Sequence, residues 1–197
     1  MQIQSNFGNF IAHEFLNVDN NSLAVYCKNK YTEHRKTQPK VSCWLNLSDP
    51  EVKPLIDIIT KQLNGLHYQL GFRKDSRQEI KEAWINVGNN EYIDAAHSHQ
   101  GWFFSGVYYV QSGPESGRIR FMTPIREMTT VILPEMCEKI NGFNSSEGEH
   151  GPDPGKLVIW PSWLIHYVTQ SAGSIERISI AFNTKIIMPE GSMSRYE

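Results

Sequence analysis

The stretch that decides the fold is His97-Ser98-His99, followed by the run Ser105-Gly106-Val107-Tyr108-Tyr109-Val110. Side chains alternate along a strand, so two histidines at positions i and i+2 project to the same face. Both imidazoles can therefore reach one point in space. Two nitrogen ligands at one point are two-thirds of a facial metal site, which leaves cis positions open for substrate or oxygen.

A third ligand is expected far away in sequence and near in space. His166 is the candidate, and Arg177 follows eleven positions later. Taken singly, each feature has a plainer interpretation: a solvated strand face for His-x-His, a strand end for His166 and a surface charge for Arg177. The metal-site hypothesis rests on the ensemble, because His166 and Arg177 both stand in apolar, β-like sequence.

Composition narrows the class of protein. The 197 residues are enough for one domain with a sizeable core, and 40% hydrophobic with 20% charged residues is ordinary for a globular protein. The net charge of −2 lacks the excess of positive charge that attracts nucleic acid or an anionic membrane. The chain starts without a signal-peptide pattern and has three widely spaced cysteines, which predicts a reducing cytoplasm, or the host cytoplasm if a phage encodes the protein.

The expected elements begin with helices and continue as short strands. Helices are predicted from Leu23 to about Glu33 and from Ser48-Asp49-Pro50-Glu51 onwards, with Asn64-Gly65 as a stop signal although the apolar spacing continues. From about residue 80 the pattern becomes β, with Ile80, Glu82, Trp84 and Asn86 on one strand face. The further strands expected are 7–16, 41–47, 92–99, 103–110, 118–122, 156–160, 164–169 and 177–184. Residues 123–155 are predicted to be one long connection, with a possible helical turn near 134–140.

This order of elements favours a mainly β fold, a sandwich or jelly roll, with helices packed on one side of a sheet. No linker divides the chain. We expect a single domain over 1–197, with a helical and mixed support region at 1–78, a β core at 79–185 and a tail at 186–197.

The second half resembles the iron(II)- and 2-oxoglutarate-dependent oxygenases, in particular a small type found in phages and bacteria. The motifs that carry the resemblance are Trp84-Ile85-Asn86, His97-Ser98-His99, Ser105 to Tyr109, Pro161 to His166 and Arg177 to Asn183. The match covers about residues 80–184, and the N-terminal third carries no motif of the family. The resemblance implies a double-stranded β-helix, a cupin-like jelly roll, that holds one Fe(II) and uses 2-oxoglutarate and O₂.

The resemblance also implies roles for individual residues. His97 matches the first iron ligand and His166 the distal histidine. Arg177 matches the residue that pairs with the far carboxylate of 2-oxoglutarate, where its planar fork and permanent charge suit a carboxylate. Ser179 and Tyr109 are placed to share that carboxylate. Asn86 is assigned to the metal-proximal carboxylate or to the substrate.

His99 departs from the wider superfamily, which has a carboxylate at this position. It is interpreted as a third, neutral ligand; the alternatives are that Asp94 or water fills the position, or that iron does not bind productively. Trp102 and Phe103, in the loop after the ligands, are the candidates for substrate contact.

The predicted activity is hydroxylation of a small molecule or a protein side chain, with release of succinate and CO₂. Two other functions stay open at this stage. One is a three-histidine enzyme without 2-oxoglutarate, either a thiol dioxygenase or a zinc enzyme, and the other is a non-catalytic jelly-roll binding module. The sequence identifies neither the substrate nor the oligomeric state, and it predicts no nucleic-acid or membrane partner.

Overall fold

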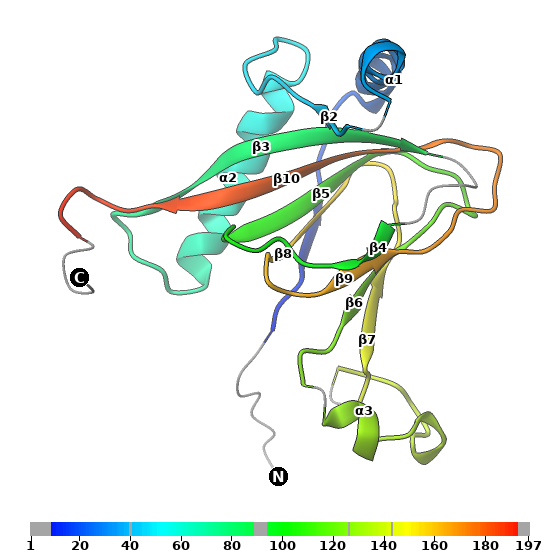
Figure 1. The fold of residues 1–197 in the computed structure, drawn as a ribbon. Coiled ribbons are helices and arrows are strands. Elements are labelled where there is room, and N and C mark those ends of the chain that lie inside the picture. The colour runs from blue at the N-terminus through cyan, green and yellow to red at the C-terminus, as the bar shows by residue number, and fades with distance from the viewer. Residues whose placement is uncertain (1–8, 40, 89–93, 126, 143, 193–197) are drawn as a thin grey trace.

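The computed structural model describes residues 9–39, 41–88, 94–125, 127–142 and 144–192. Two antiparallel sheets face each other in an open jelly roll, as Figure 1 shows. The large sheet has the order β1-β8-β5-β10-β3-β2 and the small sheet the order β4-β9-β6-β7. The strands are β1 (Ala12–Phe15), β2 (Cys43–Trp44), β3 (Arg77–Gly88), β4 (Asp94–His97), β5 (Phe104–Gln111), β6 (Ile119–Met122), β7 (Glu147–His150), β8 (Lys156–Pro161), β9 (His166–Val168) and β10 (Arg177–Ile187).

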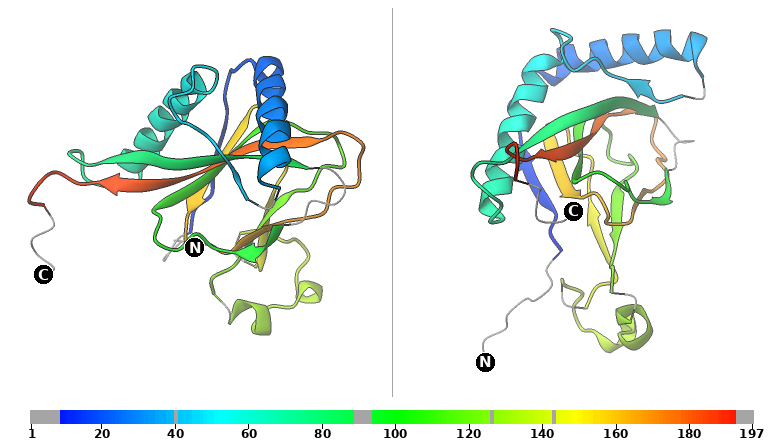
Figure 2. Two further views of the ribbon diagram at one scale, coloured as in Figure 1. Left: turned by 45° about the horizontal axis from the view of Figure 1, so that its top comes forward. Right: turned by 60° about the vertical axis from the view of Figure 1, so that its left-hand side comes forward.

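Two long helices cover the outer face of the large sheet, and Figure 2 shows them on the side away from the small sheet. Helix α1 (Asn20–Thr37) begins after Asp19, whose carboxylate accepts hydrogen bonds from the backbone N–H groups of Asn21 and Ser22. Helix α2 (Lys53–Gln69) continues through Asn64-Gly65, so the stop signal there is wrong as an end. The Asn64 side chain donates to the Thr60 carbonyl inside the helix, so it does not cap an end.

Alternation along the strands separates two cores. Ile85, Ile180 and Tyr108 point towards the helices and belong to the larger core. Val107, Tyr109 and other residues on the opposite strand faces point into the space between the sheets. That inner space is where the chain places its polar and aromatic site residues.

The β3 prediction is right for Glu82, Trp84 and Asn86 but wrong for Ile80. A bulge shifts the register, so that Glu82 pairs with Asn183 and Ile80 with Thr184. One residue of β3 is skipped, which turns Ile80 to the helix side, where it is buried in the larger core.

The 123–155 connection contains a strand that the sequence did not indicate. It carries the short helix α3 (Met128–Val131), the 3-10 turn η1 (Pro134–Met136) and then β7, which pairs with β6. Figure 1 shows α3 and its neighbours projecting away from both sheets. The predicted strand 7–16 is shorter in the structure, and its residues 7 and 8 lie outside the described ranges.

No helix in the described ranges is both long enough and apolar enough to cross a membrane.

Candidate active site

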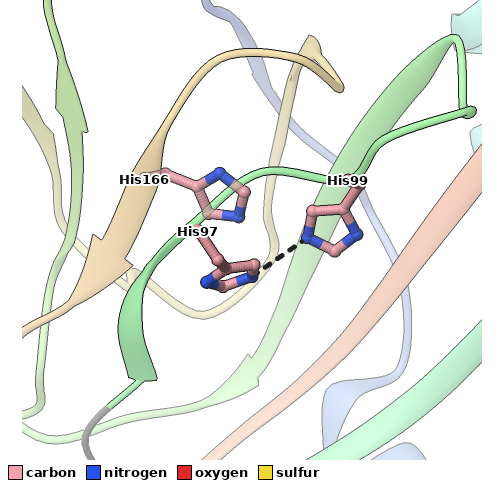
Figure 3. Close-up of side chains that lie close together, drawn as sticks. All are labelled: His97, His99 and His166. Carbon is pink, nitrogen blue, oxygen red and sulfur yellow. Dashed lines mark hydrogen bonds between the residues drawn. The ribbon is translucent and has the colours of Figure 1, made fainter.

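Three histidines meet at one end of the space between the sheets (Figure 3). His97 ends β4 and lies directly opposite His166, the first residue of β9. His99 follows two residues after β4. Each ring offers a nitrogen atom, and these atoms all lie within 4.8 Å of one another.

His99 reaches the cluster in a different way from the one predicted. The predicted strand 92–99 stops at His97, and residues 89–93 lie outside the described part of the chain. The backbone N–H of His99 donates to the Ser162 carbonyl, in the turn between β8 and β9, at 2.8 Å. The two histidines therefore do not share a strand face; a bond to the neighbouring turn places His99.

Backbone carbonyls fix the tautomers of two of the rings. His97 Nδ1 donates to the Ala95 carbonyl at 2.7 Å, and His166 Nδ1 donates to the Leu164 carbonyl at 2.9 Å. A ring that carries its proton on Nδ1 has its lone pair on Nε2, the form that a metal ligand needs.

The spacing and protonation of the rings also fit a metal. His97 Nε2 and His99 Nε2 are 3.2 Å apart, and two nitrogens each about 2.1 Å from one ion in cis positions would be roughly 3.0–3.4 Å apart. Burial, helped by the neighbouring histidines, lowers the pKa of His99 and that of His166 to about 4. Both rings are then neutral at pH 7, which is the form that binds metal.

Arg177, Ser179 and Tyr109 form a second polar group deeper between the sheets. Arg177 is 4% exposed, and its Nη1 donates to Ser179 Oγ at 3.2 Å. The guanidinium carbon lies 5.1 Å from the centre of the Tyr109 ring. The alternation of β10 explains the arrangement, because residues 177 and 179 face the same way.

The Tyr109 hydroxyl makes no hydrogen bond of standard geometry with the described residues, although it is fully buried. Burial raises the pKa of Tyr109, and the nearby Arg177 offsets part of that effect. A buried hydroxyl normally has a partner. A carboxylate beside Arg177 would accept from both groups, so these residues fit the anionic end of a dicarboxylate.

Two hollows meet at the histidines. The inner cavity, about 40 Å³, contains Arg177, Ser179 and His166 in its wall. The outer cleft, about 460 Å³, opens towards α1 and β2. The two share Trp84, Asn86, His97 and His99. The histidines therefore stand between a small hollow that contains the buried Arg177 and a larger cleft, and Asn86 borders both.

Comparison with known proteins agrees with this arrangement. A family profile described as "Putative 2OG-Fe(II) oxygenase" matches residues 82–183. The chain belongs to this family. Members are oxidoreductases that use Fe(II), 2-oxoglutarate and O₂. No curated protein sequence matches the chain.

Solved structures share the fold of this oxygenase at low identity. A prolyl-4-hydroxylase from Pseudomonas putida is 16% identical, with 89% of this chain and 86% of that chain covered and a TM-score of 0.59. AviO1 from Streptomyces viridochromogenes Tue57 is 9% identical, with 89% of each chain covered and a TM-score of 0.58. The epimerase SnoN, solved with Fe³⁺, α-ketoglutarate and nogalamycin RO, is 12% identical, with 93% and 83% covered and a TM-score of 0.59.

The two predicted substrate contacts of the oxygenase are separated in the structure. Trp102 lines the outer cleft. The Phe103 ring instead packs against Phe72 and Phe104, with centroids at 5.2 and 4.7 Å, on the side of the helices. Phe103 is absent from the lining of both hollows, so its contact with substrate stays a prediction.

Some residues of the cleft were not singled out from the sequence. Tyr31 and Arg35 of α1 and Trp44 of β2 line the outer cleft, although the N-terminal third carries no family motif. Glu82 and Asn183 also line it. The inward alternation of Glu82 with Trp84 and Asn86 was the available signal for Glu82. The side chain of Asp94, the alternative ligand, lies outside the described part of the structure.

Proposed function

We propose that this oxygenase hydroxylates a substrate bound in the outer cleft, with 2-oxoglutarate converted to succinate and CO₂. His97, His99 and His166 hold the Fe(II). Arg177, with Ser179 and Tyr109, binds the far carboxylate of 2-oxoglutarate. The observation that carries the proposal is the position of the three histidines, between a small hollow that contains a buried arginine and a larger cleft.

The bound Fe(II) supplies oxygen activation, in which one oxygen atom goes to the substrate and the other to succinate. The chain's own residues orient the reactants. Arg177 and Ser179 fix one end of the co-substrate, and because both come from β10, the strand sets its direction between the sheets. Trp84 stacks against His99, with ring centroids 5.8 Å apart, and Trp160 packs edge-on against His166 at 4.8 Å. These aromatic rings exclude water from the reaction site.

We further propose that the chain acts as one domain. The proposed metal ligands come from β4, β9 and the segment after β4, on the small-sheet side, whereas the proposed carboxylate ligands come from the large sheet. Neither sheet alone carries the complete set.

The test is an anaerobic titration of the Fe(II)-loaded protein with 2-oxoglutarate, followed through the weak visible charge-transfer band of the chelate. We expect the band to appear and saturate. In Arg177→Ala, half-saturation should rise about 30-fold or more, because removing one partner of a buried charge pair costs about 2–5 kcal/mol.

The matched control is Arg73→Ala, which removes an exposed arginine paired with Asp75 far from the site in sequence. It should leave half-saturation unchanged, and both variants should retain iron. An Arg177→Ala protein with wild-type affinity for 2-oxoglutarate would contradict the assignment.

The neutral donor set would also suit zinc or a thiol dioxygenase. Those enzymes have no use for Arg177 and Ser179 beside the metal, and family membership favours the 2-oxoglutarate reaction. The same titration separates these possibilities, since a protein that binds iron but gives no band would support them.

A further inference from the structure

The inward faces of β3 and β10 run from the co-substrate pocket to the open cleft. On β10 the inward residues succeed each other as Arg177, Ser179, Ala181 and Asn183, and Asn183 pairs across the sheet with Glu82 of β3. The His99 ring stacks on Trp84, two residues from Glu82. At about 3.4 Å per residue, Glu82 is therefore roughly 7 Å along the strand beyond the level of His99, on the side away from Arg177.

A hydrogen-bond chain holds the Glu82 carboxylate in place. Ser105 Oγ donates to Asn183 Oδ1 at 2.6 Å, which fixes the orientation of the amide. Asn183 Nδ2 then donates to Glu82 Oε1 at 2.7 Å. Within the described residues Glu82 forms no salt bridge, and its carboxylate belongs to the lining of the outer cleft. Glu82 thus presents a positioned negative charge beside the histidines.

Three tryptophans line the same cleft as Glu82. Trp44 and Trp84 form an edge-to-face pair with centroids 5.4 Å apart, and Trp102 lines the same cleft. A carboxylate among aromatic faces is the chemistry that recognises organic cations, because the ring quadrupole attracts positive charge.

Arg35, which lines the cleft, and Lys185, which contacts the cleft residue Trp102, already have partners. Arg35 donates to the Tyr31 hydroxyl at 2.7 Å and to the Pro39 carbonyl. Lys185 donates to the Gly101 carbonyl, and its ammonium lies 4.7 Å from the Trp102 ring centre. The second contact shows that a tryptophan of this cleft accommodates an ammonium group.

We propose that the outer cleft selects substrates with a protonated amine or guanidinium group, which pairs with Glu82 and packs among Trp44, Trp84 and Trp102. The proposal rests on the proposed function for the identity of the cleft as a substrate site. It places the cationic group on the far side of the histidines from 2-oxoglutarate, so that a carbon a few bonds from the charge faces the metal.

The test measures tryptophan fluorescence while n-butylammonium or its neutral counterpart 1-butanol is added to the protein. The ammonium should bind about tenfold or more tightly than the alcohol. Glu82→Gln, which keeps an acceptor for Asn183, should bring the ratio close to one, and Glu82→Asp should keep a preference for the cation. N-acetyl-lysine methylamide is titrated in parallel with n-butylammonium. Tighter binding of the lysine derivative would indicate an amine carried by a peptide, and tighter binding of n-butylammonium would indicate a free amine.

Glu79→Gln is the matched control, since Glu79 lies on the same strand but pairs with Lys81 and Arg77 at the surface. It should keep the full preference. Equal binding of ammonium and alcohol by the wild type, or an unchanged ratio in Glu82→Gln, would overturn the proposal.

The 2-oxoglutarate band provides the independent readout. An unchanged half-saturation in Glu82→Gln shows that the variant is folded and that any lost preference belongs to the cleft. The fluorescence titration also works without metal, so it gives a result even if the band is absent and the proposed function fails.

Discussion

At the scale of single residues, His99 as the proposed third ligand would set the charge of the metal centre. Three neutral imidazoles leave the full +2 of Fe(II), whereas a carboxylate at position 99 would reduce it by one. We expect His99→Asp to retain iron but to bind the 2-oxoglutarate dianion several-fold more weakly. We expect His99→Ala to lower iron affinity about tenfold or more. Chelator competition for Fe(II) and the visible titration measure the two effects. Undiminished iron affinity in His99→Ala would show that His99 is no ligand.

Position 106, in the Ser-Gly-Val-Tyr-Tyr run, has to be glycine because the Phe182 side chain fills the space next to it. A Cβ at this position would stand 2.2 Å from the Cζ of Phe182, which is fully buried. We expect Gly106→Ala to lower the free energy of unfolding by about 1–3 kcal/mol in urea denaturation, because the core has no room for the methyl group.

Gly65 is the opposite case and provides the control. It lies inside α2, and a Cβ there meets nothing within 4 Å. Gly65→Ala should raise the free energy of unfolding by about 0.5–1 kcal/mol through helix propensity. The opposite signs of the two changes test the packing directly, and a destabilised Gly65→Ala would show that α2 is packed differently.

At the scale of elements, apolar residues located the strands that are buried, and the analysis missed the strand that has none. Strands β5, β8 and β10 carry apolar residues that must be buried, so the sequence marks them. Strand β7 reads Glu-Gly-Glu-His and has no apolar alternation, because it lies at the edge of the small sheet. Its glutamates form ion pairs with Arg120 of β6, and a single-sequence pattern does not show which segment faces that arginine. The bulge that turns Ile80 is likewise a product of pairing with β10.

The edge strand β7 should be sensitive to acid. Arg120 Nε donates to Glu149 Oε2 at 2.8 Å, and Arg118 also pairs with Glu149. The hydrogen bond from Arg120, with help from Arg118, lowers the pKa of Glu149. A lowered folded-state pKa means that the stabilisation is present above the ordinary glutamate value and is lost as pH falls through the lowered one.

We therefore expect Glu149→Gln to be less stable than the wild type at pH 7, and this deficit to be smaller at about pH 3. Urea denaturation at both pH values measures this difference, since urea does not screen charges. A deficit of the same size at both values would mean that packing, rather than charge, holds β7.

At the scale of the whole molecule, the proposed ligands of iron and 2-oxoglutarate span both sheets. Binding should therefore stabilise the complete fold rather than one loop. At 2-oxoglutarate concentrations 100 times the dissociation constant, the iron-loaded protein should gain about 2.7 kcal/mol of unfolding free energy. Anaerobic denaturation with iron present measures the gain. Arg177→Ala, at the same concentration, should gain much less, and an equal gain would place the co-substrate elsewhere.

The sequence was most informative about the proposed site where rare residue types come together, as with His97, His166 and Arg177. It was least informative about the outer cleft. Tyr31, Arg35 and Trp44 reach that cleft only because α1 and β2 pack beside β3, and such long-range packing leaves no local pattern.

The inward row of β10 also limits how this enzyme can change over generations. In the proposed site, the residues from Arg177 to Asn183 serve the co-substrate at one end and the cleft at the other, and they do so by alternation. Inserting or deleting one residue between them would turn one end of the row outwards. Descendants can exchange side chains at either end independently, but the interval between the ends stays fixed. New specificities should therefore arise by substitution near Asn183 and Glu82, while length variation collects in loops such as the one that carries α3.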